Sequence, residues 1–360
     1  LAAVALVGGE YITGIFIPLS KDPEWMKVAT NFSYIQTIHI VIAITAIAIF
    51  YAVNLAGLKL SAKTQNVLTI IKIILILLLI APLFFAGQES TNQPINYSTI
   101  SPTFKEYIKA FGIGLVAVSF TYGGYQQTIN FGAEVHQPAR NVPRGIFLGI
   151  ATIILLYLAI NYAYIRVIGF ETLHQPGTKN IAAIMASKIF GVNAERILSG
   201  FLFLSVLAYV NVLLLSNPRV MYAMSKDGIL PAAFKKKDEK KDVLTVGLTA
   251  FAAIGIIVLF FAKSFNEILG FTIFLDSIGM ASSAATIFIL RKRTKHLDGT
   301  GIYKMKLFPL LPLIFIAAYI FVGISIAVNT PNLALIGLAV FGAFLLIYWS
   351  IINLKKKEQL

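Results

Sequence analysis

The sequence predicts an all-α integral membrane protein, a helical bundle of about ten membrane-spanning segments. Hydrophobic residues make up 58% of the 360 residues, charged residues make up only 13%, and the mean hydropathy is +0.80. A soluble chain of this length rarely has such a composition. The apolar residues also gather in runs of roughly 17–25 residues, the length that crosses ~30 Å of hydrocarbon.

Ten apolar segments follow one another along the chain, and each is predicted to be one transmembrane helix. They cover residues 1–19, 34–53, 65–86, 110–134, 144–168, 196–222, 243–262, 268–290, 308–328 and 333–354. The apolar run 180–190 is too short to cross a bilayer, so we expect a helix that lies against the protein at the membrane surface. The polar stretches between the segments are loops, so residues 1–360 are predicted to form a single polytopic membrane domain.

The net charge of +14 is distributed unevenly between the two sides of this topology. When loops are assigned alternately to the two sides, 20 of the 30 Lys and Arg residues fall on one side and 9 on the other, while Lys72 lies inside a span. This asymmetry follows the positive-inside rule and places both termini in the cytoplasm, for a protein of the cell membrane. The lysine runs at 235–241 and 355–357 therefore indicate orientation and lipid contact, not nucleic-acid binding.

The sequence lacks the motifs of the common catalytic and ATP-driven classes. It has no cysteine, which excludes disulfides and thiolate metal sites. It contains neither HExxH nor a GxxxxGK[ST] phosphate loop, and its four histidines are scattered. We therefore predict no metal, no cofactor and no enzymatic activity.

The segment 110–134 is interrupted by a glycine pair between two tyrosines, in the run Phe120–Tyr125. Glycine disfavours helix, and unpaired backbone groups find no water in hydrocarbon. A break is tolerated where it lines a cavity, and half-helix ends can there bind a charged solute. One interpretation is a substrate-binding hinge with Phe120, Tyr122 and Tyr125 as its aromatic wall. The alternative is a site of close helix packing.

Several charged residues fall within or beside the predicted spans. Lys72 is either a cation that faces the bundle interior, fixed or titrating, or a side chain that snorkels to the headgroups. Glu134, with Arg140 or Arg144 in the following loop, is either a cytoplasmic gate or an ordinary interfacial ion pair.

Two carboxylates, Glu10 and Asp276, also fall within predicted spans. Each is a proton site or a polar anchor between helices, because an intramembrane carboxylate is costly unless it is used or paired.

Three motifs occur along the chain. The first comprises Phe120–Tyr125, Asn130, Phe131, Glu134, Pro138 and Arg140–Arg144; the second comprises Asn54, Lys59, Gln65 and Lys72; the third comprises Pro218–Met224 and Asp227–Pro231. Together they resemble the L-type amino acid transporters of the amino acid–polyamine–organocation superfamily. The first motif is similar to that family's sixth helix.

The resemblance implies the leucine-transporter fold, with two inverted five-helix repeats and discontinuous helices one and six. The ten segments would then be family helices three to twelve, and the family's first two helices would precede Leu1. Helix one of the family supplies the amides that hold the substrate carboxylate. Residues Phe120, Thr121, Tyr122, Gly123, Gly124 and Tyr125 would bind the substrate amino group and enclose its side chain.

For function, the resemblance implies a permease for neutral amino acids that works by alternating access as an exchanger or a proton symporter. Lys72 resembles a family lysine that substitutes for a sodium ion, which implies sodium-independent transport. Two positions depart from the family pattern: Tyr125 stands where many relatives have Trp, and Ala133 where many have Glu. The alternative is a non-transporting membrane subunit or an inactive truncated fragment. The sequence identifies no partner subunit.

Overall fold

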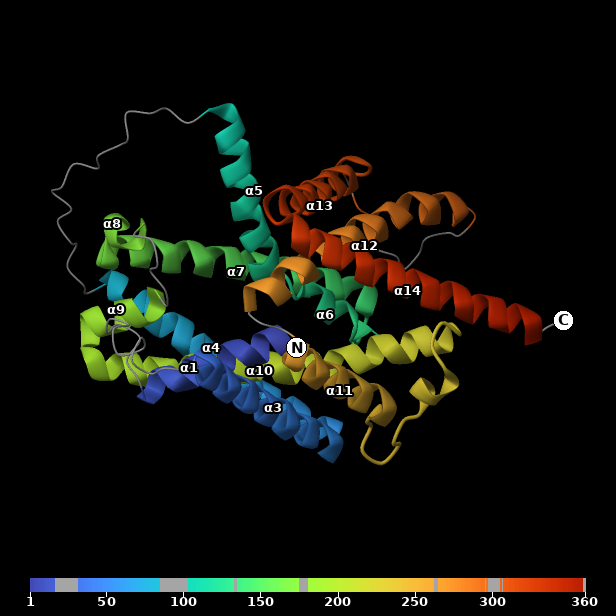
Figure 1. The fold of residues 1–360 in the computed structure, drawn as a ribbon, viewed down its shortest axis with the longest axis horizontal. Helices are drawn as coiled ribbons and strands as arrows, with labels where there is room; N and C mark the ends of the chain where they lie inside the picture. The colour runs from blue at the N-terminus through green and yellow to red at the C-terminus, as the bar shows by residue number, and fades with distance from the viewer. Residues whose placement is uncertain are drawn as a thin grey trace. The chain divides into compact units, whose positions relative to one another are not determined.

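The computed structural model describes residues 1–16, 32–84, 103–132, 135–174, 181–261, 265–294, 296, 305 and 307–358. All the regular elements in these ranges are helices, and an isolated antiparallel bridge joins Asp238 to Val243 (Figure 1). The all-α class predicted from the sequence is confirmed.

Each of the ten predicted segments contains helix in its described part, and the helix of segment 110–134 is interrupted at residues 122–124. The α-helices are α1 (Ala2–Phe16), α3 (Phe32–Ala56), α4 (Leu58–Ile80), α5 (Phe104–Thr121), α6 (Tyr125–Ile129), α7 (Pro138–Ile168), α8 (Phe170–His174), α9 (Ile181–Phe190), α10 (Val192–Lys226), α11 (Thr245–Phe261), α12 (Phe265–Arg293), α13 (Leu310–Asn329) and α14 (Pro331–Glu358). Two 3₁₀ turns, η1 (Ala81–Phe84) and η3 (Ala232–Lys235), complete the set. Within the described ranges, seven helices are long and apolar enough to cross a membrane, and Ala2–Thr13 and Thr245–Phe260 are shorter apolar helices.

Three helices, α4, α5 and α7, begin six or seven residues earlier than the hydrophobic pattern predicted. Helix α5 begins at Phe104, directly after its N-cap Thr103. Helix α4 begins at Leu58, directly after Gly57 (φ +140°), so Lys59 and Lys63 lie on its first turns and not in a loop. Helix α7 begins at Pro138, a residue that suits the first helical position because its missing N–H would be unpaired there anyway. The expected loop position of Arg140 was therefore wrong.

The chain divides into two compact units, of which the first comprises Leu1–Tyr97 and Ala151–Ala262. Its central helix is α10, which packs against α1, α3, α4, α9 and α11 (Figure 1). Small residues allow close approach: a Cβ added to Gly9 of α1 would lie 2.7 Å from the Cα of His39 in α3. Such contacts are typical of membrane helices, where dispersion forces between closely packed backbones replace the hydrophobic effect.

A buried polar network joins three helices of this unit. The Asn54 side-chain amide of α3 donates to Asn211 Oδ1 of α10 at 2.9 Å, and the Ser61 hydroxyl of α4 donates to Asn54 Oδ1 at 2.7 Å. The Asn211 amide in turn donates to Gln65 Oε1 at 2.9 Å. The residues Asn54, Ser61 and Asn211 are at most 4% exposed, so these bonds satisfy polar groups that water does not reach. The Asn54 amide also donates to the Phe50 carbonyl of its own helix at 2.7 Å.

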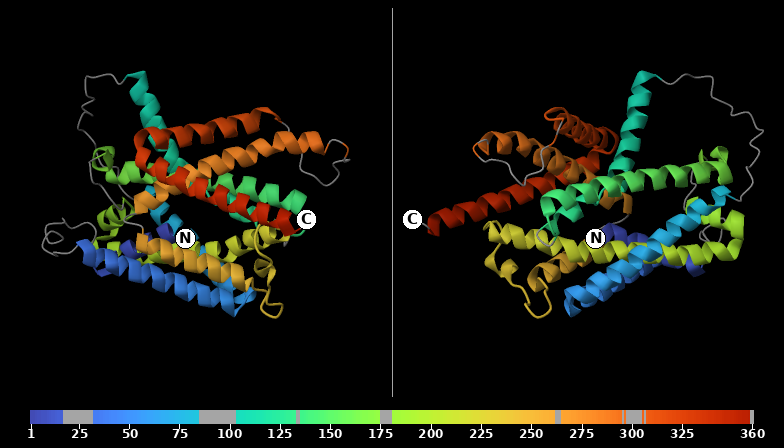
Figure 2. Two further views of the ribbon diagram at one scale, coloured as in Figure 1. Left: turned by 45° about the vertical axis from the view of Figure 1, so that its right-hand side comes forward. Right: turned by 180° about the vertical axis from the view of Figure 1, so that it is seen from behind.

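The second unit comprises Ser98–Ile150 and Lys263–Leu360. Helix α12 packs against α13, α14 and α5, and Figure 2 shows these long helices together. Its core contains Ile273 and Phe274 of α12, Val322 and Ile326 of α13 and Ala334 of α14. A Cβ added to Gly112 of α5 would lie 2.5 Å from the Ser325 hydroxyl, so α5 and α13 also approach closely.

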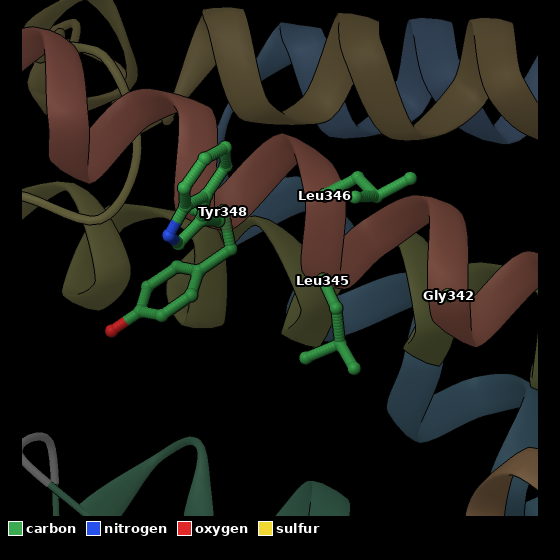
Figure 3. A pocket seen from close by; sticks show the side chains of 5 residues that line it. Gly342, Leu345, Leu346 and Tyr348 are labelled. Carbon is green, nitrogen blue, oxygen red and sulfur yellow. The ribbon is translucent and has the colours of Figure 1, made fainter.

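The outer face of α14 is apolar and accessible. Figure 3 shows a shallow surface lined by Gly342, Leu345, Leu346, Tyr348 and Trp349. Because these residues come from a single helix, they form an exposed face on which lipid chains can lie and not an enclosed substrate cavity. Trp and Tyr near the end of a membrane helix are typical of the interface between hydrocarbon and headgroups.

Replacing the central residue of the buried network tests its contribution to the fold. We expect Asn211→Ala to reduce the free energy of unfolding by about 1–3 kcal/mol, because it leaves polar groups of Asn54 and Gln65 without partners in a buried site. The measurement is thermal unfolding of the purified protein in detergent. Asn161→Ala is the matched control, since Asn161 is exposed and its amide donates to the Tyr157 carbonyl of its own helix. It should change stability by less than about 0.5 kcal/mol. Equal effects of the two substitutions would contradict the role of the network.

Candidate functional site

The helix that leads to the candidate site begins with a capping box. The Glu106 N–H donates to the Thr103 hydroxyl, and the Thr103 N–H donates to Glu106 Oε2 at 2.7 Å. The backbone hydrogen bond from Thr103 and the bond from its hydroxyl lower the pKa of Glu106, so this carboxylate stays charged at neutral pH. The box fixes the start of α5, which then continues for 18 residues to Thr121.

The helix is interrupted within the run Phe120–Tyr125. Helix α5 ends at Thr121, Tyr122 adopts φ −90° and ψ 0°, and Gly124 adopts the left-handed conformation with φ +102°. The five-residue helix α6 then begins at Tyr125. Glycine is needed at position 124, because a residue with a side chain is strained at this φ.

Some backbone groups at the break are paired and others are not. The Tyr122 N–H donates to the Val118 carbonyl at 2.9 Å, and the Gly124 N–H donates to Gln126 Oε1 at 2.9 Å. Within the described part of the chain, no hydrogen bond involves the Gly123 carbonyl or the Tyr125 amide. A break in a membrane helix thus presents an acceptor and a donor that a solute can bind.

Aromatic and hydroxyl side chains surround the turn. Tyr122 and Tyr125 are partly buried, and Phe120 is 37% exposed. The Ser119 and Thr121 hydroxyls donate back to the carbonyls one turn earlier in α5, each at 2.8 Å. Their oxygens can still accept hydrogen bonds from a ligand.

The second helical piece contacts α12 in the same unit. The Gln126 amide donates weakly to Met280 Sδ at 3.6 Å. The Tyr125 hydroxyl is buried without a hydrogen bond of acceptable geometry among the described residues; its polar neighbours are the Tyr319 hydroxyl of α13 and the Asp276 carboxylate of α12. Because Asp276 and Met280 are one turn apart on α12, the break and this face of α12 lie together.

The other predicted site residues lie elsewhere or outside the described ranges. Lys72 is partly buried on α4 in the first unit, and no hydrogen bond or ion pair of its ammonium occurs among the residues described. Arg140 and Arg144 are exposed on the first turns of α7, not in a loop as predicted. Glu134 and Ala133 lie outside the described residues. Glu10 lies on α1, where its backbone carbonyl accepts a hydrogen bond from the Thr13 hydroxyl.

Sequence reasoning missed two groups that the structure reveals. Asn211 and Tyr319 are polar side chains within long apolar helices, and this isolation was the signal that could have drawn attention to them. In the described ranges, no three His, Asp or Glu side chains gather closely enough to hold a metal ion.

These observations define a polytopic α-helical membrane protein with a broken helix in its second unit. A family model described as "Amino acid permease" matches residues 1–354, and the chain belongs to this family. The predicted membership of the amino acid–polyamine–organocation superfamily is confirmed.

Individual relatives carry transporter names. The chain is 26% identical over 305 residues to the "Serine/threonine exchanger SteT" of Bacillus subtilis, covering 83% of this chain and 67% of that protein. It is 27% identical over 277 residues to the "Methylthioribose transporter" of the same organism, covering 76% of this chain and 56% of that protein. It is 22% identical over 361 residues to the human "Large neutral amino acids transporter small subunit 2", covering 97% of this chain and 62% of that protein. The chain thus spans between about half and two thirds of the length of these relatives.

A substitution at Gly124 tests the conformation of the break. We expect Gly124→Val to destabilise the protein by about 1–3 kcal/mol, because a β-branched residue is strained at φ +102°. Thermal unfolding in detergent provides the measurement.

The matched control is Gly114→Val in α5, since Gly114 also has open space around its Cβ position but lies within regular helix. It should be neutral or slightly stabilising, because valine has a higher helix propensity than glycine. The left-handed turn would be contradicted if Gly124→Val were as well tolerated as Gly114→Val.

Proposed function

We propose that this protein is a secondary active transporter of neutral amino acids, working by alternating access without sodium, as an exchanger or a proton symporter. The observation that carries the proposal is the break between α5 and α6, in a chain of the amino acid permease family. The proposed substrate-binding residues are Phe120, Thr121, Tyr122, Gly123, Gly124 and Tyr125.

The chemistry of the break suits an amino acid. Carbonyl oxygens near the end of α5, including that of Gly123, can accept hydrogen bonds from a substrate ammonium group at the negative end of the helix dipole. The rings of Phe120, Tyr122 and Tyr125 would enclose an apolar or small polar side chain. The run 110–132 contains no lysine or arginine, which disfavours an acidic substrate.

The names of the relatives support the substrate class. SteT is named a serine/threonine exchanger and the human relative a transporter of large neutral amino acids, so neutral side chains are common to both. The methylthioribose transporter shows that a relative of similar identity is named for a different solute. Because the human relative is named a "small subunit", a partner subunit is a further element to be sought.

The remaining predicted residues have proposed roles of their own in transport. Lys72 supplies a positive charge where a sodium ion would otherwise act, which accounts for sodium independence. Arg140 and Arg144, with Glu134, form a cytoplasmic gate. The protein would lie in the cell membrane as a single transport domain, with both termini of the chain in the cytoplasm.

Counterflow in proteoliposomes tests the proposal. Vesicles that contain the purified protein are loaded with excess unlabelled serine and leucine, and traces of the labelled amino acids are added outside without sodium. We expect the labelled amino acid to accumulate inside the vesicles, and more of it when the internal concentration of unlabelled amino acid is higher. Unlabelled substrate that binds on the inside returns the carrier to its outward-facing state, where it can bind label again. A non-transporting subunit or inactive fragment predicts no load-dependent accumulation, and that result would overturn the proposal.

The same assay tests the location of the site. We expect Gly124→Val to reduce counterflow at least about tenfold, since losing 1.4 kcal/mol of binding already has this effect. Gly114→Val should retain counterflow, because it adds the same side chain outside the break. Both variants are first shown to elute as folded protein on size-exclusion chromatography. Normal counterflow by the folded Gly124→Val variant would contradict the assignment of the break as the substrate-binding site.

A further inference from the structure

A groove opens on the first unit where helix α10 begins directly after α9. Gly191, with φ +79°, forms the corner between the two helices, and its N–H donates to the Ser187 carbonyl at 2.9 Å. Helix α4 packs against both α9 and α10 (Figure 1). The space that remains between the three helices, which we call the α10 groove, has a volume of about 350 Å³.

The walls of the α10 groove are apolar. Leu78 of α4, Phe190 of α9 and Ile197 of α10 line it with large side chains that remain accessible. The small side chains of Ala186 and Ala194 leave the hollow between them. Ala186 also belongs to a buried hydrophobic cluster, so the groove has a closed floor and is not a passage between the helices. Accessible apolar side chains around a hollow indicate a surface that a hydrocarbon group covers.

The groove follows the axis of α10 over a length that suits a lipid chain. The lining residues of α10 lie on one face of the helix: Asn193, Ala194, Ile197, Leu198 and Phe201. At 1.5 Å per residue, this face extends about 12 Å from Asn193 to Phe201. One leaflet supplies about half of the ~30 Å of hydrocarbon in a bilayer, or ~15 Å. The groove is therefore nearly as long as the apolar part of one leaflet.

One end of the groove is polar. Asn193 is exposed there, and among the described residues its side chain makes no hydrogen bond. Arg196 is also exposed, and because it lies three residues further along α10 it is a neighbour of Asn193 on the helix surface. The apolar span of α10 begins at Arg196, so both residues lie at the end of the span, at headgroup level. Amide and guanidinium N–H groups donate to phosphate and ester oxygens.

We propose that the α10 groove is a binding site for a membrane phospholipid. One acyl chain lies along the groove, and the phosphate group accepts hydrogen bonds from Asn193 and Arg196. The chain supplies the dispersion contacts that Ala186 and Ala194 leave unmade, and so it stabilises the packing of α9 against α4. This inference is independent of the proposed transport function, because it concerns the surface of the first unit alone.

Photolabelling in detergent tests the site, because detergent replaces loosely held lipid and leaves tightly bound lipid in place. The purified protein in dodecyl maltoside is mixed with phosphatidylglycerol that carries a photoreactive diazirine in one acyl chain, and labelled peptides are quantified by mass spectrometry after illumination. We expect residues 186–201 to take up at least about tenfold more label than the exposed face of α14 around Leu345 and Leu346. Excess unlabelled phosphatidylglycerol should remove the difference.

A variant that fills the groove provides the second arm. Ala194→Phe should reduce the labelling of residues 186–201 at least about tenfold and leave the label on α14 unchanged. The matched control is Ala52→Phe, the same change at an exposed position of α3 in the same unit, which should keep the wild-type pattern.

Four results would each overturn the inference. The first is equal labelling of the groove and of α14 in the wild type, which would indicate loosely held lipid only. The second is full labelling of the groove in Ala194→Phe, and the third is an equal loss in Ala52→Phe. The fourth is a groove that takes no label in the wild type, as expected if a second copy of the chain covers it.

Should Ala194→Phe fail to fold, the polar end of the groove provides the decision. The double variant Asn193→Leu/Arg196→Gln changes two exposed side chains and leaves the groove open. It is labelled with the photoreactive phosphatidylglycerol and with a photoreactive diacylglycerol that has the same chains but no phosphate. We expect the wild type to be labelled several-fold more by the phospholipid, and the double variant to be labelled equally by both. A preference for the phospholipid that survives in the double variant, or that is absent from the wild type, would overturn the inference.

Discussion

The fold depends on one constraint: every backbone N–H and C=O in hydrocarbon must find a partner within the protein. Helices satisfy this constraint within a single segment, which is why the regular structure of the described ranges is helical. The turn at 122–124 relaxes the constraint locally. Its groups are partly paired by the Gln126 side chain and by the end of α5, and the remaining ones are available for binding.

The same constraint governs polar side chains, and the two units meet it differently. In the first unit, Asn54, Ser61 and Asn211 satisfy one another and join three helices into a closed network. In the second unit, the Tyr125 hydroxyl is buried without a hydrogen bond of acceptable geometry among the described residues. A network in which every polar group is hydrogen-bonded stabilises one arrangement of helices. A buried hydroxyl without a partner does not fix the arrangement in this way, so the helices around it can change conformation more easily.

Hydrophobic runs predicted the helices, and the glycine pair at 123–124 predicted the position of the break, because both depend on local composition. Hydrophobic runs misplaced the starts of α4, α5 and α7, because Lys59, Lys105 and Arg140 are polar enough to resemble loop residues although the backbone there is already helical. The partners of Asn211 and Tyr125 could not be predicted. They lie on other helices, and contacts between helices depend on tertiary packing that no single segment encodes.

The exposed apolar face of α14 has a consequence for how this family diverges. Side chains such as Leu345 and Leu346 are more than half exposed, and in a bilayer any similar hydrocarbon group would serve there equally well. Substitutions among Leu, Ile, Val and Phe on such surfaces are nearly neutral and accumulate by drift. Helix α10, surrounded by protein, has far less freedom to vary. Identity with relatives can therefore fall to 22% while the match still extends over 97% of the chain.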